Sequence, residues 1–119
     1  EIDLFGQGNG ETIRGKQVSG TGGLADFVRA ARRGPGGRSF LALTSTAARG
    51  KASCIVPRLA EGAMATVSRA DADYVVTEHG IAHLRDLTVR QRGDALIELA
   101  APAFRDELRA AWGEVMKGL

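Results

Sequence analysis

The chain has 119 residues, of which 44% are hydrophobic and 25% are charged, the composition of one ordinary globular domain with its own core. Its formal net charge of +2 gives no reason to expect a nucleic-acid partner. No apolar run approaches the roughly 18 residues of a membrane span. The single cysteine, Cys54, excludes an internal disulfide and suits a small buried hydrophobic position.

The start of the chain shows no signal peptide, so a cytoplasmic or matrix-like compartment is the default expectation. The first residue is Glu1 rather than methionine. We therefore expect a fragment or a processed product of a longer protein.

Hydrophobic and β-branched segments predict short strands separated by glycine-rich turns. They lie at 2–5, 13–18, 40–43, 53–56, 65–67 and 74–77. Segment 40–43 is apolar throughout, which indicates a strand buried on both faces. Segment 74–77 is β-branched and aromatic and is typical of a strand. The patterns at 53–56 and 65–67 are weaker, and 13–18 fits a strand or an extended segment.

Three helices are expected. The first covers 24–33 and ends at the Gly34–Gly37 segment. Thr88 and Gln91 form a capping box that begins the second helix. Pro102 suits the first turn of the third. The inward-facing positions of the last two helices are expected at Leu96, Ile97, Ala100, Phe104, Leu108, Ala111, Trp112 and Val115.

Strands interspersed with helices favour an α/β fold, layered, with a mostly parallel sheet flanked by helices. Neither an internal repeat nor a flexible linker divides the chain. A single domain over residues 1–119 is therefore predicted.

A glycine-dense turn precedes the first helix, with Gly20, Thr21, Gly22 and Gly23 in succession. Glycine lets a ligand approach the backbone, and the free N–H groups of the helix start can face a carbonyl, carboxylate or phosphate oxygen. The spacing matches neither a Walker motif nor a dinucleotide fingerprint. A turn without a ligand stays the alternative.

Glu78 follows the 74–77 strand, at the edge where ligands bind in open α/β sheets. It either orients an active-site loop or caps the next turn. Ser45 follows the 40–43 strand at a similar edge, without the flanking glycines of a nucleophile elbow. His79 and His83 lie four residues apart, but no third ligand is nearby, so structural or surface roles are favoured over a metal site.

A basic neighbourhood surrounds the end of the first helix, at Arg29, Arg32, Arg33 and Arg38. The favoured interpretation is a solvated helix end with favourable dipole placement. An anion contact, for example to a nucleotide phosphate, is the functional alternative.

Four ordered motifs cover nearly the whole chain. They are Gly6-Gln7-x-Asn9-x-Glu11 with Ser19-Gly20-Thr21-Gly22-Gly23-x-x-Asp26-Phe27; Ser45-Thr46-Ala47 with Gly50-Lys51-x-Ser53-x-Ile55-Val56-Pro57; Val75-Val76-Thr77-Glu78-x-Gly80-Ile81-Ala82-x-Leu84-Arg85; and Pro102-x-Phe104-Arg105-x-x-Leu108. In this order they resemble the C-terminal domain of the acetyl-CoA hydrolase/transferase family. That family includes 4-hydroxybutyrate and succinyl-CoA:acetate CoA-transferases.

The resemblance implies a CoA-transferase-like α/β fold of the NagB/RpiA/CoA-transferase type, in which two related domains face each other. This chain would be the C-terminal half, with the N-terminal half absent. The family's ping-pong mechanism moves CoA from a short-chain acyl-CoA to a carboxylate, or to water, through a glutamyl-CoA thioester. Coenzyme A is then a substrate, and no permanently bound cofactor or metal is expected.

The resemblance also assigns site residues. The nucleophilic glutamate belongs to a His-Thr-Glu segment that this chain lacks, so Glu78 is not given that role. Asn9 would lie against the active glutamate, and Gly50 would offer an oxyanion-stabilising amide. The Gly20–Gly23 turn and Glu78 would border the CoA site.

Three positions depart from the family pattern. Gly8 replaces an apolar residue, His83 stands where aspartate is common, and Asp86 stands where glycine is common. These departures affect local loop geometry rather than the fold.

The expected partners are acyl-CoA, a short-chain carboxylate and the N-terminal domain, with a homo-oligomer as a further option. Hydrolase and transferase activities are not separated by this sequence. A non-catalytic CoA-binding or assembly domain of the same fold is the alternative function. An unrelated α/β module whose glycine-rich turn binds a phosphate is a third possible function.

Overall fold

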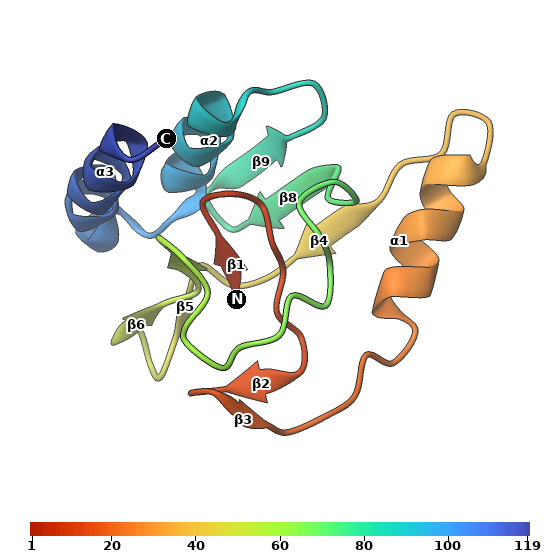
Figure 1. Cartoon of the computed structure of the whole chain (residues 1–119), viewed down its shortest axis with the longest axis horizontal. Coiled ribbons are helices and arrows are strands. Elements are labelled where there is room, and N and C mark those ends of the chain that lie inside the picture. The colour runs from red at the N-terminus through yellow and green to blue at the C-terminus, as the bar shows by residue number, and fades with distance from the viewer.

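The computed structural model describes residues 1–119 as short strands and three helices (Figure 1). In chain order the elements are β1 (Ile2–Asp3), β2 (Thr12–Ile13), β3 (Lys16–Gln17), α1 (Leu24–Arg33), β4 (Phe40–Ala42), β5 (Thr46–Ala47), β6 (Ala52–Ser53), β7 (Ile55–Val56), β8 (Tyr74–Thr77), β9 (Gly80–His83), α2 (Val89–Leu99) and α3 (Pro102–Lys117). The α/β class predicted from the sequence is confirmed.

The strands form four small sheets of mixed direction, so the expected single, mostly parallel sheet is not found. The central sheet has the order β4-β8-β9, with β4 parallel and β9 antiparallel to β8. Strands β1 and β7 pair in parallel, whereas β2–β3 and β5–β6 are hairpins. A tight turn accounts for one departure from the expected parallel sheet. Arg14 and Gly15 both have positive φ, and they fold segment 13–18 back on itself as an antiparallel hairpin.

One face of the central sheet is buried and the other is open, contrary to the expectation for 40–43. Val75 and Ala82 on the inner face are buried under α2. On the outer face Phe40 is 56% exposed and Ile81 is 64% exposed. Because helices of this chain cover a single side, the apolar run at 40–43 forms a half-exposed strand.

Helices α2 and α3 pack together and supply much of the core (Figure 1). The predicted capping box is confirmed, because the Thr88 side chain accepts from the Gln91 amide and Gln91 bonds back to Thr88. Pro102 occupies the first turn of α3, also as predicted. The buried helix residues are Gly93, Leu96, Ile97, Leu99, Leu108 and Trp112. The Trp112 ring meets Phe5 edge to face at 5.2 Å, which ties α3 to the start of the chain.

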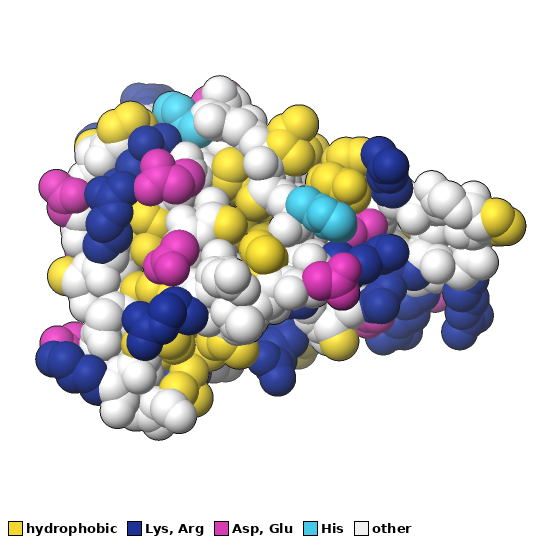
Figure 2. All heavy atoms as spheres, turned by 90° about the horizontal axis from the view of Figure 1, so that it is seen from above, with side chains coloured by type: hydrophobic (Ala, Val, Ile, Leu, Met, Phe, Trp, Pro, Cys, Tyr) yellow, Lys and Arg dark blue, Asp and Glu magenta, His cyan; other side chains and the backbone are white.

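Helix α1 stands apart from the sheets in Figure 1, and only its Val28 is buried. Arg29 and Arg32 each approach Asp71 at 3.4 Å. Lys and Arg side chains gather along the lobe on the right of Figure 2, where α1 lies. These arginines therefore lie at a solvated helix end, as favoured from the sequence, and two of them also form surface ion pairs with Asp71.

Other local predictions need correction. No strand was expected at 80–83, so β9 was missed. The expected strand at 65–67 is reduced to an isolated bridge between Val67 and Gly8. Cys54, expected to be buried, is partly exposed. Asp86, where the resemblance led us to expect glycine, has φ of +66°, a conformation that glycine adopts without strain.

Candidate functional site

Ser45 and Glu78 meet at the carboxyl ends of the parallel strands β4 and β8. The Ser45 amide donates to Glu78 Oε2 at 2.8 Å, and the Ser45 hydroxyl donates to Oε1 at 2.6 Å. Ser45 is fully buried, whereas half of the Glu78 side chain is exposed. The carboxylate therefore holds the loop after β4 while keeping one side open to a ligand.

These contacts keep Glu78 ionised. The Ser45 hydroxyl is the main cause, followed by the Ser45 amide and the backbone amide of Glu78, and together they lower the pKa of Glu78 from 4.5 to about 2. His79 adds a weak attraction, with its Nε2 3.7 Å from Oε1. At neutral pH this carboxylate accepts hydrogen bonds and cannot donate a proton.

The hairpin that follows Ser45 has an unusual tip. Ala48, Arg49 and Gly50 all have positive φ, at 50°, 57° and 82°. The Gly50 amide donates to the Ala47 carbonyl at 3.1 Å, and no atom lies within 4 Å of where a Gly50 Cβ would stand. Ala48 and Arg49 are consecutive non-glycine residues with left-handed backbone conformations, which store strain, and such strain clusters at functional sites.

Both ends of this hairpin are tied down. Ser45 is bound by Glu78 on one side, and its carbonyl accepts from the Cys54 amide at 2.8 Å on the other. Strands β5 and β6 pair through Thr46 and Ser53. Glu78 thus positions the hairpin that presents Gly50.

Asn9 lies in a second group, and all its side-chain polar atoms are engaged within the chain. Its Oδ1 accepts from the amides of Glu11 and Thr12, each at 3.0 Å. Its Nδ2 donates to Glu1 Oε1 at 2.9 Å and to the Thr12 carbonyl at 3.0 Å. The side chain therefore shapes the loop from which β2 starts.

The glycine-rich turn is attached to this second group. The Ser19 hydroxyl donates to the Gly10 carbonyl at 3.0 Å, and the Ser19 amide donates to the Glu11 carbonyl at 3.2 Å. Gly20 and Gly22 are exposed, with open space around both. Gly23 is the N-cap of α1 and leaves its end without a side-chain cap. Thr21 is exposed as well.

The structure thus brings Ser45 and Glu78 together, with Gly50 at the tip of the hairpin that follows Ser45, and it joins Asn9 and the glycine-rich turn in a second group. Leu43, two residues before Ser45, lines the same hollow as Asn9. The sequence analysis placed Ser45 and Glu78 at sheet edges but did not join them. Their position after two neighbouring parallel strands was the signal that could have done so.

Three carboxylates are buried, at Asp3, Glu11 and Asp73, and the sequence analysis assigned none of them a role. Glu11 accepts from the Thr66 hydroxyl at 2.7 Å, and Asp73 accepts from Arg85 at 3.1 Å and contacts His83 Nε2 at 2.9 Å. Glu11 stands in the first family motif, but its partner Thr66 is 55 residues away, so no local pattern indicates this bond. His83 therefore lies in a cluster with Asp73 and Arg85 on the sheet and stacks on Tyr74.

No group of three His, Cys, Asp or Glu side chains is arranged to hold a metal ion. None of the three helices is both long and apolar enough to cross a membrane.

Comparison with known proteins defines the class first. The fold matches RipA from Yersinia pestis with a TM-score of 0.90 and 45% identity, over 98% of this chain and 26% of that one. It also matches a 4-hydroxybutyrate CoA-transferase from Porphyromonas gingivalis with a TM-score of 0.72 and 39% identity, over 100% of this chain and 25% of that one. The chain is thus a compact α/β domain of the kind found in CoA-transferase chains.

Sequence relatives make the assignment specific. A family model described as the acetyl-CoA hydrolase/transferase C-terminal domain matches residues 1–112. The 4-hydroxybutyrate coenzyme A transferase of Clostridium kluyveri is 50% identical over 91% of this chain and 25% of its own length. An acetyl-CoA hydrolase of Yarrowia lipolytica is 34% identical over 92% of this chain and 21% of its own length.

The chain belongs to the acetyl-CoA hydrolase/transferase family, within its C-terminal domain. It spans about a quarter of the length of the curated relatives it matches.

Proposed function

We propose that the chain is the C-terminal domain of an enzyme that moves CoA between a short-chain acyl-CoA and a carboxylate, or to water. The observation that carries the proposal is the family match over residues 1–112, within which Glu78 binds Ser45 at the start of the hairpin that carries Gly50. The relatives include both CoA-transferases and acetyl-CoA hydrolases, so both acceptors belong to the proposal.

In the proposed reaction a glutamate outside these 119 residues attacks the acyl-CoA carbonyl and expels the CoA thiolate, which forms an anhydride. The thiolate then attacks the glutamyl carbonyl, releases the first carboxylate and forms the glutamyl-CoA thioester. An acceptor carboxylate reverses these two steps and leaves as a new acyl-CoA. If water attacks instead, free CoA leaves and the glutamate is restored.

The residues of this chain would bind and position the reacting groups. Each carbonyl attack places negative charge on an oxygen, which a fixed N–H donor stabilises. The Gly50 amide is the proposed donor at the tip of the β5–β6 hairpin, and an oxyanion would share it with the Ala47 carbonyl. Glu78 would act as a positioning residue, because it holds Ser45 and hence the start of that hairpin.

The second group would form another part of the cleft. Asn9 fixes its loop through four hydrogen bonds, and its backbone would face the active glutamate. The exposed Gly20–Gly23 turn would border the CoA site, because no side chain blocks the approach to Gly20 or Gly22.

The test uses the full-length gene product with acetyl-CoA and a panel of short carboxylates, and follows both new acyl-CoA and free CoA. New acyl-CoA identifies a transferase and its acceptor, and free CoA alone identifies a hydrolase. Saturable CoA binding without turnover would favour the non-catalytic domain instead. Binding of a simple nucleotide but of no CoA compound would favour the unrelated phosphate-binding module.

A matched pair of variants tests the role of Glu78. Glu78→Gln removes the charge that holds Ser45, and a displaced hairpin would lower kcat on the order of 100-fold. Glu98→Gln is the control, since Glu98 makes only surface contacts with Arg105 and Arg109. Equal activity in both variants would show that Glu78 has no positioning role.

A further inference from the structure

Strand β4 lies at the edge of its sheet and pairs only with β8. The Ser39 carbonyl accepts from the Tyr74 amide, and the Leu43 amide donates to the Val76 carbonyl, each at 3.0 Å. Because successive residues of a strand turn their backbone groups to opposite sides, the N–H and C=O groups of Phe40 and Ala42 point away from β8. The outer edge of β4 is therefore open.

This edge strand is short, at three residues, but it lacks the other usual protections. Natural edge strands carry charged side chains, proline or a bulge that prevent pairing with another strand. Segment 40–43 reads Phe-Leu-Ala-Leu, with no charge and no proline, and both Phe40 and Ala42 are exposed. An apolar edge of this kind is a template for pairing with another strand.

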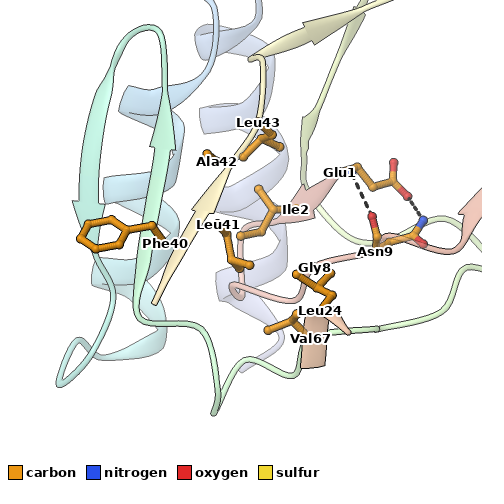
Figure 3. Close-up of a pocket in the computed structure, with 10 residues that line it drawn as sticks. All are labelled: Glu1, Ile2, Gly8, Asn9, Leu24, Phe40, Leu41, Ala42, Leu43 and Val67. Carbon is orange, nitrogen blue, oxygen red and sulfur yellow. Dashed lines mark hydrogen bonds between the residues drawn. The ribbon is translucent and has the colours of Figure 1, made fainter. Parts of the chain in front are cut away.

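A groove of about 330 Å³ runs beside the open edge (Figure 3). Its apolar wall is made by Ile2, Leu24, Phe40, Leu41, Ala42, Leu43 and Val67. The polar side chains at its rim, Glu1 and Asn9, bond to each other, with Asn9 Nδ2 2.9 Å from Glu1 Oε1. Small-molecule sites add a few convergent polar groups, from side chains or backbone, that fix the ligand. Here the unpaired polar groups are those of the β4 backbone, which suit another strand.

We propose that a β-strand from the part of the protein outside these 119 residues pairs with the open edge of β4 and packs apolar side chains into this groove. The relatives are about four times as long as this chain, so their remaining length can supply such a strand. Glu1 itself lines the groove, so residues joined to its amino end would be within immediate reach. The inference rests on the chain being one domain of a longer enzyme, as proposed above, and not on the roles of Gly50 or Glu78.

The first test is hydrogen exchange of single amides in the full-length protein. The Leu43 amide is bonded to β8 and serves as the protected reference, and the exposed Gly36 amide serves as the open one. A paired edge makes the Phe40 and Ala42 amides exchange at least about 100-fold more slowly than Gly36 and close to Leu43. Exchange of both amides as fast as Gly36, with Leu43 protected, would overturn the proposal.

The second test places a charge on the edge. Ala42→Lys, in the full-length protein, sets a charged side chain beside the added strand and lowers the melting midpoint by about 2–4 °C or more. Ala110→Lys, at an exposed position of α3, is the control and leaves the midpoint unchanged. Equal midpoints for the two variants would count against a covered edge.

Mass photometry over a concentration series identifies the occupant. Protection of Phe40 and Ala42 in the monomer supports a strand of the same chain, whereas protection that appears only on oligomerisation assigns the edge to a second copy and refutes the proposal. Neither readout depends on turnover. A protein with a protected edge and no CoA chemistry would refute only the proposed function. An active enzyme with an open edge would refute only this inference.

Discussion

Gly93 in α2 lies against Trp112 of α3, and we predict that replacing it with alanine destabilises the domain. A Cβ at this position would be 2.0 Å from Cε2 and 2.3 Å from Nε1 of Trp112, where ordinary contact begins at 3.4 Å. Trp112 is only 3% exposed and is held against Phe5, so the indole has little room to move. Gly93→Ala therefore forces either the ring or the α2–α3 spacing to change.

Two opposing effects set the magnitude. Alanine in place of glycine inside a helix gains about 1 kcal/mol of intrinsic propensity. Overpacking a close-packed core costs about 1–3 kcal/mol, and a contact this short belongs at the upper end. The expected net loss for Gly93→Ala is roughly 2 kcal/mol in the free energy of unfolding.

Gly113 provides a matched control. It lies in α3, is exposed, and has no atom within 4 Å of where a Cβ would stand. Gly113→Ala should therefore raise the free energy of unfolding by about 1 kcal/mol through propensity alone. The pair separates the steric effect from the helical one.

The assay is urea unfolding of the full-length protein followed by circular dichroism, with wild type, both single variants and the double variant Gly93→Ala/Trp112→Phe. An unchanged slope with a lower midpoint identifies a true loss of stability. The smaller ring in the double variant should recover part of the loss, with a coupling energy of about 0.5–3 kcal/mol. A Gly93→Ala protein as stable as wild type would refute the reasoning.

The remaining predictions concern the Glu78 carboxylate, the Thr88 capping box and the turn at Asp86. Because the folded-state pKa of Glu78 is lowered from 4.5 to about 2, the stability contributed by its carboxylate is fully present above about pH 4.5 and is lost as the pH falls toward 2. Ser45→Ala removes the main cause, so NMR titration of the Glu78 carboxyl should show its pKa move up toward 4.5; an unchanged value would contradict the assigned cause. Thr88→Ala breaks the capping box with Gln91 and should lower the free energy of unfolding by about 1 kcal/mol, measured by urea unfolding. Asp86→Gly relieves a φ of +66° and should leave the thermal midpoint equal or higher, whereas a clear fall would mean that the aspartate side chain stabilises its turn.

Local signals in the sequence predicted the helices well. The bounds 24–33 of α1 follow from the glycines on both sides, and the start of α2 follows from the Thr88 capping box. The apolar spacing of α3 located the buried Leu108 and Trp112. These features depend on residues at most four positions apart, so a linear pattern contains them.

The sheets were predicted less well, because strand pairing joins distant segments. The direction of β9 and the half-open state of β4 depend on which neighbours each strand meets. An apolar run such as 40–43 looks the same whether its second face is covered by this chain or by another part of the protein. The sequence therefore predicted the strand but not its exposure.

The candidate site divides in the same way. Family motifs in the sequence by themselves indicated the family that the comparisons confirmed, and they singled out Asn9, Gly50, Glu78 and the Gly20–Gly23 turn as candidates, which stay predictions. Tertiary structure alone decided that Ser45 and Glu78, 33 residues apart, bond to each other. The physical reason is that parallel strands bring their carboxyl ends to one sheet edge, and only the folded chain reveals which strands are neighbours.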